Sequence, residues 1–179
     1  MPHIRIDNDL PGIRGLMAHR PDVAGPLNQL AETLLRGSSP LSRGERELIA
    51  AYTSELNGTR YCSASHAAFA AAQLDGGQDL VASVLQGPDD APIPQRLRAL
   101  LRIASEVQSQ ARPVSAQALA AARTAGAGDD EIHDTVLIAA AFCMYNRYVD
   151  GLDTELPADP GYYEEGARRI VSQGYGAPR

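Results

Sequence analysis

The chain has 179 residues, of which 44% are hydrophobic and 21% are charged. This composition excludes a disordered chain, and the length fits one domain over residues 1–179. The formal net charge is −6 and all 16 basic residues are arginines without a basic run, which argues against a nucleic-acid partner.

The N-terminal residues and the cysteine content indicate the compartment. Residues 1–10 contain acids and a proline where a secretory signal needs a basic start and an apolar run. No apolar stretch approaches the roughly 20 residues needed to cross a bilayer. The two cysteines, Cys62 and Cys143, lie too far apart in sequence to suggest a disulfide framework. We therefore expect a cytoplasmic protein with reduced thiols and no membrane partner.

Glycine and proline divide the chain into segments of helical length, and no segment keeps a period-2 strand pattern. The sequence therefore predicts an all-α fold. The predicted helices cover residues 11–19, 23–36, 43–57, 60–74, 79–86, 94–110, 116–125, 130–152 and 162–172.

The predicted hairpin at residues 43–75 carries clear helix-end signals. Ser42 precedes Glu45 by three residues, which is the pattern of a capping box. Gly58 can adopt the left-handed conformation that ends a helix, and the Thr59 hydroxyl can cap the next helix. A tight turn at Gly58 should therefore fold two helices against each other.

The later half of the chain is predicted to supply the central helix. Residues 87–94 contain three prolines and read as a connector between two halves of a bundle. The segment 130–152 is apolar on two faces, one of them through Leu137 and Met144, so we expect it in the core or in a subunit interface. Small-residue faces at 67–72 and 116–122 also favour a homo-oligomer.

Three chemically reactive residue types are expected to meet in the hairpin. Glu47 lies eleven residues before Gly58 and His66 lies eight after it. At about 1.5 Å per residue, their heights along an antiparallel hairpin differ by about one turn. Cys62 precedes His66 by four residues, so both side chains share a helix face.

This arrangement suits a reactive thiol. Cys62 is expected at the third position of its helix, where unpaired N–H groups and the helix dipole favour a thiolate. His66 could accept the thiol proton, with Glu47 orienting the imidazole or acting as the base. The alternative is structural, because a free cysteine is often only a small buried hydrophobic residue.

The same residues carry a family resemblance. The run from Glu47 through Cys62 to His66 resembles the AhpD-type pattern of a glutamate, then C-x-x-C, then a histidine four residues beyond the second cysteine. The stretch AAAFCMYNRYVDGLD resembles the C-terminal core helix of the peroxidase-related subgroup. The resemblance spans about residues 41–152 and implies an AhpD-like helical bundle, usually oligomeric.

The resemblance implies reduction of hydroperoxides, in which the second cysteine attacks the peroxide and the first resolves the sulfenic acid. Cys62 matches the second cysteine, but Thr59 stands at the first position. Threonine forms no disulfide, so the two-cysteine cycle is closed. An external thiol would have to reduce the sulfenic acid, since Cys143, on a core helix, is a poor resolving partner.

Two other functions stay open. The segment RGERELIA, with a histidine on the following helix, also resembles carboxymuconolactone decarboxylases, which implies acid–base chemistry by Glu47 and His66 on a small organic acid. The third possibility, from another class, is a non-catalytic helical oligomer.

Several further residues are candidates for the substrate pocket. Tyr61 and Ser65 flank the thiol, and Thr59 replaces the first cysteine. His133 could enter the pocket from the long helix, although a solvated histidine is the simpler interpretation. Arg147, with Asn146, matches the N-R pair of the family, and we expect it in an internal ion pair or in the pocket. No compact ligand motif indicates a metal, and we expect no cofactor.

Overall fold

The computed structural model describes residues 2–159 and 161–176, and the described residues form nine helices and no strand. The fold is the all-α bundle that the sequence predicts. The helices are α1 Gly12–His19, α2 Pro21–Arg36, α3 Arg43–Leu56, α4 Arg60–Ala71, α5 Gly77–Gln86, α6 Gln95–Ser109, α7 Ala116–Thr124, α8 Asp129–Gly151 and α9 Tyr162–Gln173.

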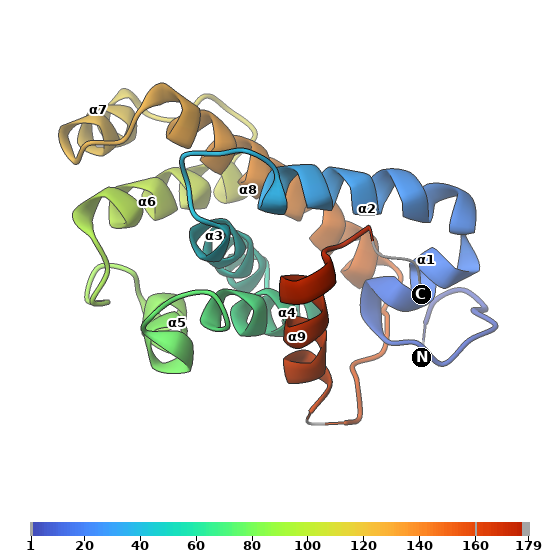
Figure 1. Cartoon of the computed structure of the whole chain (residues 1–179). Helices are drawn as coiled ribbons and strands as arrows, with labels where there is room; N and C mark the ends of the chain where they lie inside the picture. Colours follow the sequence, from blue (N-terminus) through green and yellow to red (C-terminus); the bar gives the residue numbers. More distant parts are fainter. Residues whose placement is uncertain (1, 160, 177–179) are drawn as a thin grey trace.

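Helices α3 and α4 form a hairpin at the centre of the fold, and they make the most extensive helix–helix contact (Figure 1). The capping box at Ser42 and Glu45 is present, with both side-chain-to-backbone hydrogen bonds formed. Gly58 has φ +73°, the left-handed conformation that the sequence predicts at the turn. These local signals fix the start of α3 and the direction of α4.

The remaining helices enclose this hairpin. The long helix α8 packs on α3 and on α6, while α9 lies against α4 (Figure 1). The largest fully buried apolar side chains come from α1, α2, α3, α5, α6, α8 and α9, together with Leu41 ahead of α3: Leu16, Leu35, Leu41, Leu48, Ile49, Val84, Leu100, Leu101, Ile103, Ile138 and Ile170. Burial of these side chains is the main driving force for the packing of the bundle.

The helix ends differ from the predicted ones by a few residues. Helix α2 begins at Pro21 rather than Val23, because proline has no N–H to lose at the first helical position. Helix α4 ends at Ala71 instead of residue 74, since a turn follows. The connector over residues 87–94 contains no helix, as predicted.

One prediction about a side chain is wrong. The Thr59 hydroxyl does not cap α4 but donates a hydrogen bond to the Asp150 carboxylate on α8. The second apolar face of α8 is only partly buried in this chain, because Leu137 is 40% exposed and Met144 is 44% exposed. The predicted homo-oligomer stays a prediction.

Candidate functional site

The hairpin brings Glu47 and His66 into direct contact. The Nδ1 atom of His66 lies 2.6 Å from Oε2 of Glu47. Glu47 is 1% exposed and His66 is 8% exposed, so the pair is shielded from bulk water. A buried carboxylate at this distance fixes the tautomer and the orientation of the imidazole ring.

Three aromatic rings pack against the imidazole of His66. The Tyr175 hydroxyl donates a hydrogen bond to Oε1 of Glu47 at 2.7 Å. The Tyr175 ring is stacked with the His66 ring at an interplanar angle of 17°, and Phe69 and Phe142 meet the imidazole edge-on. With Nδ1 directed at Glu47, the second ring nitrogen, Nε2, is available to a substrate.

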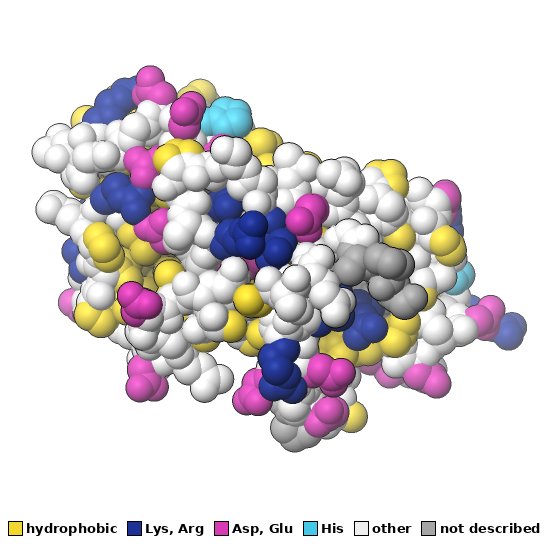
Figure 2. Space-filling view, viewed as in Figure 1, with side chains coloured by type: hydrophobic (Ala, Val, Ile, Leu, Met, Phe, Trp, Pro, Cys, Tyr) yellow, Lys and Arg dark blue, Asp and Glu magenta, His cyan; other side chains and the backbone are white. Residues whose placement is uncertain are grey.

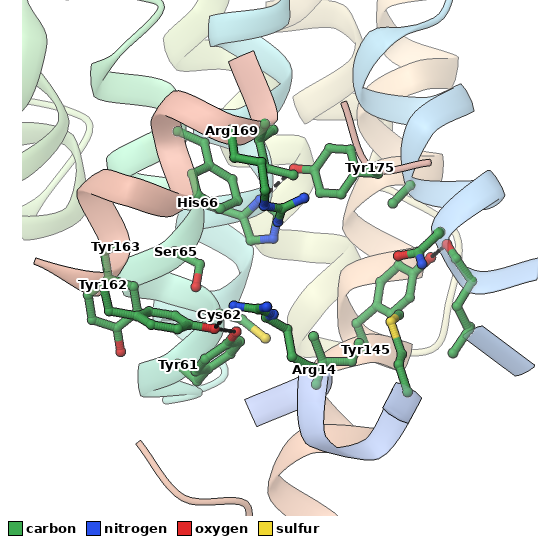
Figure 3. Close-up of a pocket in the computed structure, with 18 of the residues that line it drawn as sticks. Arg14, Tyr61, Cys62, Ser65, His66, Tyr145, Tyr162, Tyr163, Arg169 and Tyr175 are labelled. Carbon is green, nitrogen blue, oxygen red and sulfur yellow. Dashed lines mark hydrogen bonds between the residues drawn. The ribbon is translucent and has the colours of Figure 1, made fainter. Parts of the chain in front are cut away.

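A cavity of about 650 Å³ adjoins this pair. Figure 3 shows Tyr61, Cys62, Ser65 and His66 from α4 on one wall, with side chains of α1, α8 and α9 facing them. The volume lies within the usual range for small-molecule sites. Tyr61 and Ser65 therefore lie in the cavity wall, where the sequence predicts them. Glu47 does not line the cavity but supports His66 from behind.

Cys62 lines the same cavity, but the pKa of its thiol is raised rather than lowered. Burial raises the pKa of the Cys62 thiol to about 12, and the negative charge of Asp150 adds to the increase. A hydrogen bond with Asn146 lowers the pKa, but by less. The pKa is therefore raised rather than lowered as expected from the start of α4, because desolvation of the thiolate is the largest influence on it. At neutral pH Cys62 is a thiol.

Thr59 and Arg147 lie at a separate shallow groove, lined also by Asn57, Asn146, Asp150 and Gly151. Thr59 is fully buried at its base. Arg147 is exposed and donates to the backbone oxygen of Cys143 at 2.9 Å, and the ion pairs among the described residues do not include it. The structure therefore does not bring these two residues into the cavity beside His66.

His133 and Cys143 also lie outside the cavity lining. The His133 side chain is 69% exposed and lies 3.1 Å from the neighbouring Asp134 carboxylate. His133 therefore does not line the pocket, and it is a solvated histidine, the simpler interpretation of the sequence. Cys143 is half-buried, with its sulfur 3.7 Å from Nδ2 of Asn57.

The sequence interpretation missed the residues that close the cavity from α1 and α9. Arg14 and Arg169 bring two guanidinium groups to it, and Tyr162 lies beside Tyr61 (Figure 3). The Tyr162 hydroxyl is 2.8 Å from the Tyr61 hydroxyl and accepts a hydrogen bond from Arg14 at 3.4 Å. Burial and the neighbouring Tyr162 raise the pKa of Tyr61, so its phenol stays protonated.

The residues that the structure describes contain no group of three or more histidine, cysteine, aspartate or glutamate side chains that could hold a metal ion. Over the same residues, no helix is both long and apolar enough to span a membrane.

Figure 2 shows acidic and basic side chains interspersed on one face of the molecule.

Comparison with known proteins agrees with this geometry. Residues 21–87 match the carboxymuconolactone decarboxylase family. The AhpD core structure of an uncharacterized peroxidase-related protein from Ralstonia eutropha JMP134 has 26% identity and a TM-score of 0.77, over 88% of this chain and 82% of the other. An uncharacterized peroxidase-related protein from Silicibacter sp. TM1040 has 25% identity and a TM-score of 0.76, over 86% and 78%. No curated protein matches significantly.

The helical bundle has an AhpD-like fold. The chain is similar to the AhpD-like carboxymuconolactone decarboxylase superfamily, through the family match over residues 21–87 and through two peroxidase-related structures.

Proposed function

We propose that the protein is an oxidoreductase that reduces an organic hydroperoxide at Cys62, with His66 as the proton acceptor and Glu47 as the group that orients it. One observation carries the proposal. The buried pair, joined at 2.6 Å, adjoins a cavity whose wall carries a thiol one helical turn before the imidazole.

The raised pKa of Cys62 makes the base necessary. Because the thiol is protonated at neutral pH, its proton must leave as the sulfur attacks. In the proposed step the sulfur bonds to the terminal peroxide oxygen and the O–O bond breaks. The thiol proton passes to Nε2 of His66 and then to the departing alkoxide. The products are a sulfenic acid on Cys62 and one alcohol.

Regeneration requires two equivalents of an external thiol. The first condenses with the sulfenic acid, which releases water and leaves a mixed disulfide on Cys62. The second attacks the mixed disulfide, which restores the Cys62 thiol and releases an oxidised disulfide. Thr59 supports this external route, because it provides no sulfur and its hydroxyl is engaged by Asp150.

The cavity favours an organic hydroperoxide over hydrogen peroxide. Its volume of about 650 Å³ fits a substrate with a hydrocarbon body, and its wall includes Ile13, Met17 and Phe142. Arg14 and Arg169 would suit a substrate that also carries a negative group.

Peroxide consumption with glutathione as the external thiol tests the proposal. The wild-type protein should consume cumene hydroperoxide, and Cys62→Ser should lose this activity. Cys143→Ser is the matched control and should keep it, because Cys143 does not line the cavity. Equal rates for the wild type and Cys62→Ser would reject the mechanism.

A second candidate is an acid–base lyase or isomerase acting on a small organic acid without covalent catalysis. The thiol pKa of about 12 favours it, because a neutral Cys62 then serves only as part of the wall. In that case Cys62→Ser would keep activity on an organic acid and His66→Ala would lose it. The third possibility is a non-catalytic oligomer, which a closed environment around Cys62 would favour. The cavity beside the buried pair argues against it.

A further inference from the structure

The carboxylate of Glu47 has two oxygens, and each has its own partner. Oε2 meets His66, whereas Oε1 accepts the Tyr175 hydroxyl from the segment after α9. We propose that Tyr175 is a positioning residue for the candidate site: its hydroxyl holds the Glu47 carboxylate and thereby sets the proton affinity of the Glu47–His66 pair. This inference rests on the proposed role of His66.

The geometry gives Tyr175 two contacts with the pair. Its hydroxyl oxygen lies 2.7 Å from Oε1 of Glu47 and 3.5 Å from Nδ1 of His66, and its ring is stacked beside the imidazole. A phenol has one proton to donate, and the shorter distance assigns it to Glu47. Burial, together with the Glu47 charge, raises the pKa of Tyr175, so the hydroxyl remains a donor at neutral pH.

Helix α2 holds the segment that carries Tyr175. The Glu32 carboxylate accepts the backbone N–H of Tyr175 at 2.7 Å and pairs with Arg36 at 3.3 Å. Arg36 donates to the backbone oxygen of Ile170 at 2.9 Å, near the end of α9. Gly174 has φ +81°, and a Cβ there would lie 2.5 Å from Glu32 Oε2. These contacts direct the Tyr175 ring inward, toward the Glu47–His66 pair.

A hydroxyl in this position should change the titration of the pair. Donation to Oε1 stabilises the carboxylate, so the pair binds an additional proton less tightly. Removing the hydroxyl therefore raises the pH at which the pair takes up that proton, whichever residue carries it.

Other charged groups nearby stay in place when only the hydroxyl is removed. The charged groups are Glu32 and Arg36 on α2, Arg46 beside Glu47 on α3, Arg14 on α1, and Glu165 and Arg169 on α9. The other titratable groups are the Cys62 thiol and the phenols of Tyr61, Tyr145, Tyr162 and Tyr163. A shift in Tyr175→Phe can then be assigned to the lost hydrogen bond.

NMR titration of the histidine ring nitrogens tests the inference without any substrate. The wild type, Tyr175→Phe and Tyr148→Phe are labelled with ¹⁵N-histidine, and the His66 signals are assigned by their loss in His66→Gln. The His66 midpoint should rise by about one pH unit in Tyr175→Phe, because a hydrogen bond to a charged group is lost. Tyr148 is half-buried on α8 outside the cavity lining, so its variant should titrate like the wild type.

Tyr175→Ala removes the ring as well and should shift the midpoint in the same direction. A wild-type midpoint in Tyr175→Phe would overturn the inference, whatever the midpoint of Tyr175→Ala, because the hydroxyl would then have no effect on the pair. An equal shift in Tyr148→Phe would overturn it too, because the effect would then not be specific to the hydroxyl on Glu47. Failure of the peroxide assay would leave this result unchanged, so the two proposals are separately testable.

Discussion

The imidazole of His66 is held 2.6 Å from the carboxylate of Glu47, although nineteen positions separate the two residues in the chain. The turn at Gly58 produces this contact by folding α4 back along α3. Both side chains are buried, and of the two only His66 lines the cavity. In the proposed mechanism, Glu47 thus acts on a substrate through His66.

Glu47→Gln should lower turnover by about 100-fold. The amide keeps the shape of the side chain but removes the charge that orients Nδ1 and stabilises an imidazolium, and positioned proton transfer is worth about 10²- to 10⁴-fold. The measurement is kcat for hydroperoxide reduction, with folding checked by circular dichroism. The exposed Glu164→Gln on α9 serves as control. A kcat within threefold of the wild type would contradict the role of Glu47.

The residues in the hairpin were predictable because local signals determine its geometry. The capping box at Ser42 sets the start of α3, and the glycine at position 58 sets the turn, so residue counting along two helices places Glu47 near His66. The ionisation state of Cys62 was not predictable in this way. Its position in α4 favours a thiolate, but burial by helices distant in sequence dominates the pKa.

The far wall of the cavity was not predictable, because it depends on tertiary packing. Arg169 and Tyr175 approach the hairpin only because α9 packs on α4, and no local spacing relates them to His66.

Cys62 should be slow to alkylate in the native protein. In a Cys143→Ser background, the rate with iodoacetamide at pH 8 should be at least about 100-fold lower than in urea-unfolded protein, because a thiol pKa near 12 leaves little thiolate. The native rate should still rise up to pH 10. Mass spectrometry of timed samples gives both rates. A plateau below pH 9 would show an ordinary or lowered pKa.

Thr59→Cys should introduce the missing resolving thiol. Two cysteines in a C-x-x-C arrangement at the start of α4 can form a disulfide, so the sulfenic acid on Cys62 would be resolved internally. Peroxide consumption with dithiothreitol should increase by about tenfold. The loss of the hydrogen bond to Asp150 should cost about 1 kcal/mol of unfolding free energy, measured in urea.

The matched control is Thr59→Ser, which keeps the hydroxyl and adds no sulfur. It should consume peroxide at the wild-type rate. Failure of Thr59→Cys to exceed this control, although mass spectrometry finds the new disulfide, would argue against Cys62 as the residue attacked by peroxide.

Arg169 should select substrates that carry a negative group. Its guanidinium lines the cavity from α9, and the ion pairs found among the described residues do not include it. Arg169→Gln should raise KM by about tenfold for a fatty-acid hydroperoxide, because a charge-assisted contact with the carboxylate is lost. KM for the neutral cumene hydroperoxide should change less than twofold. The adjacent Arg168→Gln, exposed on α9 outside the lining, should leave both values unchanged. An equal change for the charged and the neutral substrate in Arg169→Gln would mean that the guanidinium shapes the cavity without recognising charge.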